Sequence, residues 1–199
     1  MSKKQIMNQT DAMARAARAK KVTWVGFWVN VVLSVAKIIA GIVGRSGAMI
    51  ADGVHSISDF VTDIIVIVFI GVSAKGENTR FRYGHGKFET FATMLISFAL
   101  FAVAVGLFWT SFSQIVDALN GKVLPRPEMV ALVMAFVSVV AKEWLFHYTR
   151  VAGEQMNSMA LVANAWHHRS DAFSSIAVLV GIGCAMFLGE RWRVLDPIA

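Results

Sequence analysis

Long apolar runs dominate the chain from residue 22 onward, with neither the alternation of a strand nor the one-sided stripe of a surface helix. Five of these runs come near or above the roughly 20 residues that a helix needs to cross a bilayer. They cover residues 22–43, 48–72, 88–115, 130–148 and 161–188. The pattern predicts an all-α polytopic membrane domain over residues 22–199, preceded by a polar, basic segment over residues 1–21.

Composition supports this prediction. Of the 199 residues, 56% are hydrophobic and 16% are charged, whereas soluble domains average about 45–50% apolar and about 25% charged residues. The mean hydropathy is +0.59. These values exclude a soluble globule and a disordered chain, and the bilayer becomes the expected solvent. The net charge of +6 does not indicate a nucleic-acid partner, because basic residues gather in the loops of membrane proteins.

The distribution of basic residues predicts the orientation. If the amino terminus is cytoplasmic, that side receives Lys3, Lys4, Arg15, Arg18, Lys20, Lys21, Lys75, Arg80, Arg82, Lys87, Lys142 and Arg150. The other side receives only Arg45, Lys122, Arg126, Arg191 and Arg193, so a cytoplasmic amino terminus is favoured. Lys37 and Arg169 fall inside predicted spans, where each needs a cavity, a partner or the interface. The lack of targeting features and long loops favours a bacterial inner membrane.

A segment of the second predicted span is repeated in the fifth. Residues 46–59, SGAMIADGVHSISD, align without a gap with residues 158–171, SMALVANAWHHRSD. Each copy contains His-x-x-x-Asp, which places both side chains on one face of a helix. The two pairs are His55 with Asp59 and His167 with Asp171. The two spans run in opposite directions, and inverted repeats with polar groups near mid-membrane are typical of substrate sites in secondary transporters.

Ionisable residues within a span cost a few kcal/mol each, so matched pairs of them need a compensating partner. A divalent cation is suited to that role. Two imidazoles and two carboxylates form a tetrahedral shell suited to Zn²⁺ at about 2.0–2.2 Å, with Cd²⁺ and Co²⁺ as alternatives. Mg²⁺ and Ca²⁺ prefer oxygen ligands and are disfavoured. The alternative is that the pairs serve only helix packing, which the duplication makes the weaker interpretation.

Further polar residues extend the same helix faces. Asp52 and Asn164 lie one turn before the histidines, and Asp63 lies one turn after Asp59. They either line an ion path or form a hydrated polar stripe, and the sequence favours neither. His168 points about 100° away from its neighbour His167, so we expect it at a helix interface and not in the ligand set.

Four motifs carry a family resemblance. They are SGAMIADGVHSISD, RYGHGKFE at residues 82–89, KEWLFHYT at residues 142–149 and LVANAWHHRSDAFSS at residues 161–175. Together they resemble the cation diffusion facilitator family of divalent-metal/proton antiporters. The resemblance implies a six-helix membrane domain, usually a homodimer, often followed by a cytoplasmic metallochaperone-like domain, which we do not expect within residues 1–199. It also assigns the transport site to His55, Asp59, His167 and Asp171.

In this family, a histidine at the position of His55 accompanies zinc transport, and an aspartate there accompanies less selective transport. The resemblance therefore favours Zn²⁺ as cargo, with Cd²⁺, Co²⁺ and Fe²⁺ as alternatives. Some members hold an accessory metal in the loop before the third helix. Only His85 of that set is present, because Asn78 and Phe81 replace the other ligands, so we expect no competent loop site.

The end of the chain resembles the opening of the family's sixth helix. Asp196 precedes Pro197, and proline suits the first turn of a helix. The resemblance also implies that Lys87 and Asp196 pair as a charge interlock at a dimer interface. Equally, Lys87 is one of the cytoplasmic basic residues and Asp196 an acid at a helix amino terminus.

The sequence thus predicts alternating access coupled to protons. Histidine has an ordinary pKa of about 6.5, and a metal binds the neutral imidazole and the ionised carboxylate, so metal and protons compete for the same groups. The predicted activity is export of a divalent cation in exchange for protons, with Zn²⁺ as substrate and no prosthetic group. A metalloenzyme is disfavoured, because the chain lacks a His-Glu-x-x-His motif. A structural or sensor protein and a cation channel remain alternatives.

Overall fold

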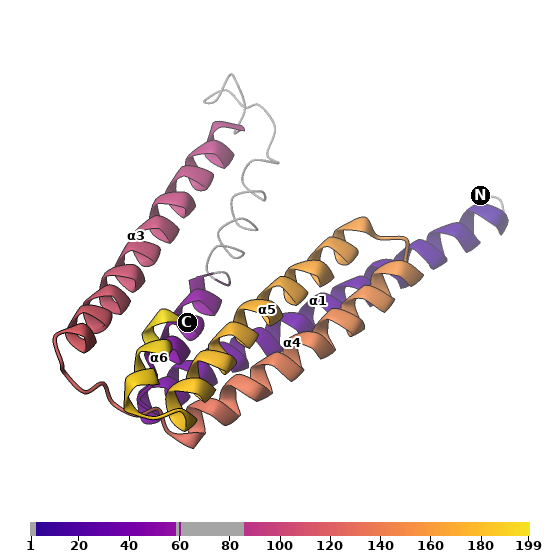
Figure 1. The fold of residues 1–199 in the computed structure, drawn as a ribbon. Coiled ribbons are helices and arrows are strands. Elements are labelled where there is room, and N and C mark those ends of the chain that lie inside the picture. Colours follow the sequence, from indigo (N-terminus) through magenta and orange to yellow (C-terminus); the bar gives the residue numbers. More distant parts are fainter. Residues whose placement is uncertain (1–2, 59, 61–85) are drawn as a thin grey trace.

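The computed structural model describes residues 3–58, 60 and 86–199 (Figure 1). The named helices are α1 (Lys3–Val43), α3 (Gly86–Leu119), α4 (Met129–Gln155), α5 (Met159–Phe187), the 3₁₀ helix η1 (Glu190–Val194) and α6 (Leu195–Ile198). Residues 47–58 form a further helix between α1 and α3. Every regular element in these ranges is helical, which confirms the predicted all-α class.

Within the residues that the structure describes, four helices are long and apolar enough to cross a membrane. Their spans are Lys21–Val43, Ser97–Leu119, Met129–Gln155 and Leu161–Phe187. Each lies within or overlaps a predicted span, whereas the predicted span of residues 48–72 lies partly outside the described residues. The helices extend beyond the apolar runs: α1 begins at Lys3, and α4 continues to Gln155 with an Arg150–Glu154 pair of 2.8 Å in its last turns. Hydropathy marks the limits of the apolar run and not those of the helix.

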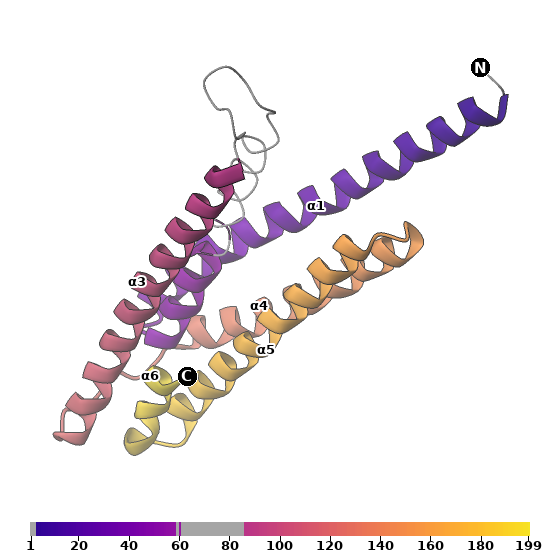
Figure 2. The ribbon, with the colours of Figure 1, turned by 90° about the horizontal axis from the view of Figure 1, so that it is seen from above.

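The helices α1, α4 and α5 lie side by side with the helix of residues 47–58, while α3 stands apart from α4 and α5 (Figures 1 and 2). None of the most apolar window of Ser97–Leu119 is buried inside the chain. Large apolar side chains such as Phe98, Phe101 and Trp109 are more than half exposed along α3. Such a surface is expected of a helix whose solvent is lipid.

Packing differs between the two ends of this bundle. The larger apolar cluster, which includes Ala40, Met49, Ala135 and Ile182, lies where α1 ends and α4 begins. At the other end the cluster consists of Val22, Ala152 and Leu161, with Tyr148 and Met156 packed against it. Figure 2 shows the amino-terminal part of α1 diverging from α4 and α5. The bundle is therefore packed most closely at the end that holds the carboxyl end of α1.

The chain turns from α1 into the next helix in the same way as it turns from α4 into α5. Arg45 and Asn157 occupy the same place in the two turns, with φ of 50° and 51°. One residue later, the Ser46 amide donates to the Gly41 carbonyl at 3.0 Å, and the Ser158 amide donates to the Gly153 carbonyl at 2.9 Å. The two helical hairpins thus share one turn geometry, at positions related by the sequence repeat.

The serines that follow these turns cap the next helix. The Ser46 hydroxyl accepts from the Met49 amide at 3.1 Å, and the Ser158 hydroxyl accepts from the Leu161 amide at 3.5 Å. This is the usual role of a serine at a helix amino terminus. The first turn lies beside the start of α4, since the Glu128 amide donates to the Gly44 carbonyl at 2.8 Å, whereas the second turn follows the end of α4. The repeated hairpins therefore point in opposite directions.

Candidate metal centre

Helix α5 carries two predicted ligands on one face. The His167 Nε2 atom lies 3.9 Å from Asp171 Oδ2, as the i, i+4 spacing predicts. The imidazole is 55% exposed and the carboxylate 13% exposed. Two ligand atoms on a tetrahedral Zn²⁺ ion are separated by roughly 3.4 Å, given bond lengths of about 2.0–2.2 Å. A shift of roughly half an ångström would therefore let His167 and Asp171 share one ion.

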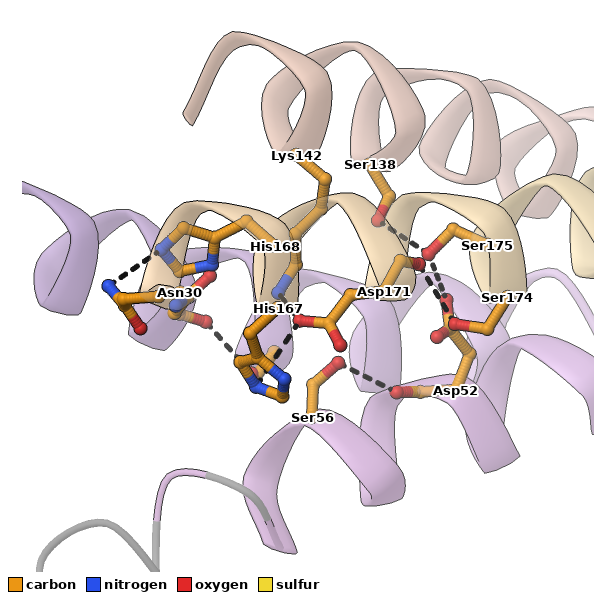
Figure 3. Close-up of polar contacts among 12 residues, drawn as sticks. Asn30, Asp52, Ser56, Ser138, Lys142, His167, His168, Asp171, Ser174 and Ser175 are labelled. Atoms are coloured by element: carbon orange, nitrogen blue, oxygen red, sulfur yellow. Dashed lines mark hydrogen bonds and ion pairs between the residues drawn. The ribbon is translucent and has the colours of Figure 1, made fainter. Parts of the chain in front are cut away.

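A lysine from α4 neutralises this carboxylate. The Lys142 ammonium donates to Asp171 Oδ2 at 2.8 Å, and the lysine side chain is 5% exposed (Figure 3). The sequence counted Lys142 among the basic residues of the cytoplasmic side, and the structure shows that its side chain is buried inside the bundle. A lysine this deeply buried needs an anionic partner, and Asp171 supplies it.

A second buried ion pair joins α1 to the helix of residues 47–58. Lys37 Nζ lies 2.8 Å from Asp52 Oδ2, and the two side chains are 1% and 4% exposed. The ammonium also donates to the hydroxyls of Ser56 and Ser175, each at 3.3 Å. Three oxygens thus surround the Lys37 ammonium, for which the sequence predicted a need for a partner without identifying one.

Serine hydroxyls extend this network across the bundle. The Ser175 hydroxyl donates to Asp52 Oδ2 at 3.3 Å, and the hydroxyls of Ser138 and Ser175 are 3.4 Å apart (Figure 3). The network therefore joins α1, the helix of residues 47–58, α4 and α5. Asp52 is enclosed in this network. Its predicted role in lining an ion path stays a prediction.

His168 lies at a helix interface, as its direction predicts. It is 3% exposed, and its Nε2 atom lies 3.4 Å from Asn164 Nδ2. The same Nε2 atom would be 3.7 Å from a Cβ atom placed on Gly26 of α1. His168 therefore fills the space between α5 and α1, and Asn164 is its hydrogen-bonding neighbour.

The Arg169 guanidinium makes cation–π contacts with aromatic rings. Its guanidinium carbon lies 4.7 Å from the ring centroid of Phe146, 5.4 Å from that of Trp166 and 6.0 Å from that of Phe173. These cation–π distances give an intramembrane cation a favourable environment. The need for a partner, which the sequence predicts for Arg169, is thus met by α4 and α5.

Asp196 caps a helix that is distant in sequence. Its carboxylate accepts from the Ser46 hydroxyl at 2.6 Å and from the Gly47 and Ala48 amides at 2.7 and 3.4 Å. The side chain is buried at the amino terminus of the helix of residues 47–58, where a negative charge is stabilised. Its charge interlock with Lys87 stays a prediction, since the Lys87 side chain lies outside the described residues.

Several candidates are not placed. Asp59, Asp63 and His85 lie outside the described residues. His55 lies on the helix of residues 47–58, one turn beyond Asp52, with an exposed side chain. In the parts of the chain that are described, no three His, Cys, Asp or Glu side chains gather closely enough to hold a metal ion. The structure thus shows one hairpin's ligand pair and part of the other's.

The sequence missed the partners of the buried carboxylates. Lys37 stands in an otherwise apolar run, and Lys142 stands beside Glu143 within a predicted span; a lysine at such a position is a signal for a buried ion pair. The repeated segments do not indicate which residue pairs with each aspartate, because both lysines lie on the helices that precede these segments. Ser138 and Ser175 give no sequence signal beyond their small polar side chains.

Comparison with known proteins defines the class. Residues 23–199 match the family model described as the cation efflux transmembrane domain. The chain therefore belongs to the cation efflux family, whose members include a metal transporter and an efflux system protein, neither of which is an enzyme.

Relatives in this family come from distant organisms. The chain is 34% identical to mitochondrial metal transporter 1 of Saccharomyces cerevisiae over 81% of its length, which is 36% of that protein. It is 34% identical to magnetosome protein MamB of Magnetospira sp., over 89% of the chain and 59% of the relative. It is 33% identical to manganese efflux system protein MneP of Bacillus subtilis, over 94% of the chain and 63% of the relative. The chain thus spans between about a third and two thirds of the length of these relatives.

Proposed function

We propose that the chain forms the membrane pathway of a secondary transporter that exports a divalent cation, Zn²⁺ first, in exchange for protons. The proposed site consists of His55, Asp59, His167 and Asp171. The observation that carries the proposal is the His167–Asp171 pair on α5, whose spacing recurs in an inverted hairpin with the same turn. Family membership makes transport the expected activity.

Helix register supports a site shared between the two hairpins. The helix of residues 47–58 runs antiparallel to α5, and the Ser175–Asp52 hydrogen bond of 3.3 Å aligns them. With a rise of about 1.5 Å per residue, one turn beyond Asp52 corresponds to one turn before Ser175. This register would bring His55 to the level of Asp171, and Asp59 to the level of His167.

The donor set favours Zn²⁺. Imidazole and carboxylate together suit Zn²⁺ in tetrahedral geometry, whereas Mg²⁺ and Ca²⁺ prefer shells of oxygen. The name of the relative MneP makes Mn²⁺ the main rival. At a common site of nitrogen and oxygen donors, the general order of affinity places Mn²⁺ below Zn²⁺.

Protons are the proposed counter-substrate, because they compete with the metal for the same imidazoles and carboxylates. The hairpins, related by an inverted repeat, would rock so that the site faces each side of the bilayer in turn. We place the amino terminus in the cytoplasm by the basic-residue distribution, and the protein in a bacterial inner membrane. A homodimer is carried over from the family resemblance. The alternative functions are those of a structural or sensor protein and of a cation channel.

The test is flux through proteoliposomes. The whole protein is reconstituted with a metal-sensitive dye inside, a pH gradient is imposed, and Zn²⁺, Mn²⁺, Cd²⁺ and Co²⁺ are added in turn. His167→Ala should abolish uptake, because it removes one ligand from the proposed site. The matched control is His147→Ala, because His147 forms an exposed i, i+4 pair of 3.3 Å with Glu143 on α4. The control should retain uptake.

Each rival has its own outcome. Metal flux that ignores the pH gradient would favour a channel over an antiporter. No flux of any metal would favour a structural role for the histidines and aspartates. Equal uptake by the His167→Ala and His147→Ala variants would contradict the site. Faster uptake of Mn²⁺ than of Zn²⁺ would overturn the preferred substrate while leaving the site intact.

A further inference from the structure

Asp171 is already paired with a cation in the chain itself. The Lys142 ammonium binds Oδ2 at 2.8 Å, and His167 Nε2 lies 3.9 Å from the same oxygen. The oxygen that faces the imidazole is therefore the one that the ammonium occupies. A metal ion held between His167 and this oxygen of Asp171 would compete with the ammonium for Oδ2.

The other hairpin places a neutral residue at the position equivalent to Lys142. The offset that aligns Ser46 with Ser158 and Asp59 with Asp171 also aligns Asn30 of α1 with Lys142 when it is extended to the preceding helices. The Asn30 Oδ1 atom is buried and has no hydrogen-bond partner in the part of the chain that is described. Of the two proposed aspartate ligands, Asp171 therefore has a lysine on the preceding helix of its hairpin, whereas Asp59 has an asparagine at the equivalent position.

Asn30 also lies near the level of Asp171 along the bundle. Helices α1 and α5 run parallel, because Gly26 lies against His168 and Lys37 reaches Ser175 further along both helices. Asn30 is one turn beyond Gly26, as Asp171 is nearly one turn beyond His168. A buried acceptor without a partner is costly, and an ammonium is a donor that would satisfy it.

We propose that Lys142 is a positioning residue that acts as the resident counter-cation of the metal site. It binds Asp171 in the metal-free protein, and the arriving ion displaces it toward the acceptor on Asn30. This inference rests on the proposed function, because it requires Asp171 to be a ligand. Its consequence is that the site binds metal less tightly, and releases it faster, than the four ligands alone would.

The physical cause is repulsion between cations in a poorly solvated interior. A divalent ion and an ammonium close to the same carboxylate repel each other strongly where water is scarce. Removing the ammonium leaves Asp171 without a partner, so a metal ion gains the whole attraction of that carboxylate. A lysine that served the fold alone would not oppose the metal in this way.

The test compares metal affinity and turnover in the whole protein. Lys142→Gln should lower the Kd for Zn²⁺ about tenfold or more by calorimetry in detergent, since one competing unit charge is lost. In proteoliposomes the same variant should show a lower KM and a lower maximal rate, because release slows. Lys142→Arg keeps the charge, and its Kd should stay within about threefold of the wild type. The matched control is Lys122→Gln, because Lys122 forms an exposed pair of 2.8 Å with Asp117.

A double-mutant cycle locates the effect. In an Asp171→Asn background, Lys142→Gln should no longer change the Kd, since the carboxylate for which the lysine competes is gone. This background also removes the unpaired buried charge, so it guards against a variant that fails to fold. An unchanged or weaker affinity in a folded Lys142→Gln protein would overturn the inference. If the wild type neither binds nor moves Zn²⁺, Mn²⁺, Cd²⁺ or Co²⁺, the proposed function itself fails.

Discussion

The two helical hairpins have the same turn geometry but differ in the positions of their buried lysine and aspartate side chains. Each turn has a residue in the left-handed conformation at the same place, Arg45 or Asn157, followed by the same hydrogen bonds and a serine cap. The equivalent positions are Lys37 with Thr149, Asp52 with Asn164, Asn30 with Lys142 and Asp59 with Asp171. In the first hairpin, the lysine forms an enclosed pair near the closely packed end of the bundle. In the second, the lysine is bound to a proposed ligand. The duplicated scaffold thus carries two different arrangements of charge.

The largest effect should come from the enclosed pair. Lys37→Met leaves the Asp52 carboxylate buried without its cation, and loss of one partner from such a pair costs about 3–5 kcal/mol. Thermal unfolding in detergent should show a large fall in melting temperature. Adding Asp52→Leu should restore most of it, because no charge is then left unpaired. Lys122→Met, in an exposed pair, should change nothing measurable; a fall equal to that of Lys37→Met would contradict this account.

The next effect distinguishes the two turns by their closeness of packing. A Cβ atom on Gly41 would lie 2.8 Å from the Ile50 backbone nitrogen, whereas one on Gly153 would lie 3.0 Å from the Val162 nitrogen. We expect Gly41→Ala to destabilise the protein by about 2–3 kcal/mol and Gly153→Ala by about 1–2 kcal/mol, since overpacking forces backbone shifts. Denaturant unfolding of both variants measures the difference. A reversed order would show that the first turn relaxes more easily.

A smaller effect concerns the cap that only the first hairpin receives from Asp196. Asp196→Ala removes charged hydrogen bonds to the Ser46 hydroxyl and the Gly47 amide and should cost about 1–2 kcal/mol. Asp196→Asn should cost less, because one amide oxygen still accepts. Thermal unfolding of the two variants tests the order. Equal losses would mean that the charge at this helix terminus is unimportant.

The smallest effect is that of the serine cap in the second hairpin. Ser158→Ala removes one hydrogen bond to the Leu161 amide and should cost about 0.5–1 kcal/mol. Ser46→Ala should cost more, because Ser46 also donates to Asp196 at 2.6 Å. The same unfolding measurement compares them, with matched chemistry at equivalent positions. A larger loss for Ser158→Ala would contradict the difference between the two caps.

The sequence predicted the parts of the site that depend on short spacing. The repeat placed His167 and Asp171 on one helix face, and the structure confirms their proximity. Such features need only helical periodicity.

Partners from other helices were not predictable. Lys142 and Asp171 meet because α4 and α5 pack in one particular register, and no local pattern specifies that register. The same holds for Asp196, which lies in the first turn of its own helix as predicted but also binds Ser46, a partner that its sequence neighbours do not indicate. Periodicity fixes the face that a side chain occupies, whereas packing fixes its neighbour across the bundle.

We propose above that the two hairpins contribute ligands to one metal site. The most direct measurement is the stoichiometry and Kd of Zn²⁺ binding to the whole protein, with His55→Ala, His167→Ala and the double variant. We predict one ion per chain, a loss of affinity of about a hundredfold or more for each single variant, and little further loss for the double variant. Two ions per chain, or losses that simply add, would show that the hairpins bind metal independently and would contradict the claim.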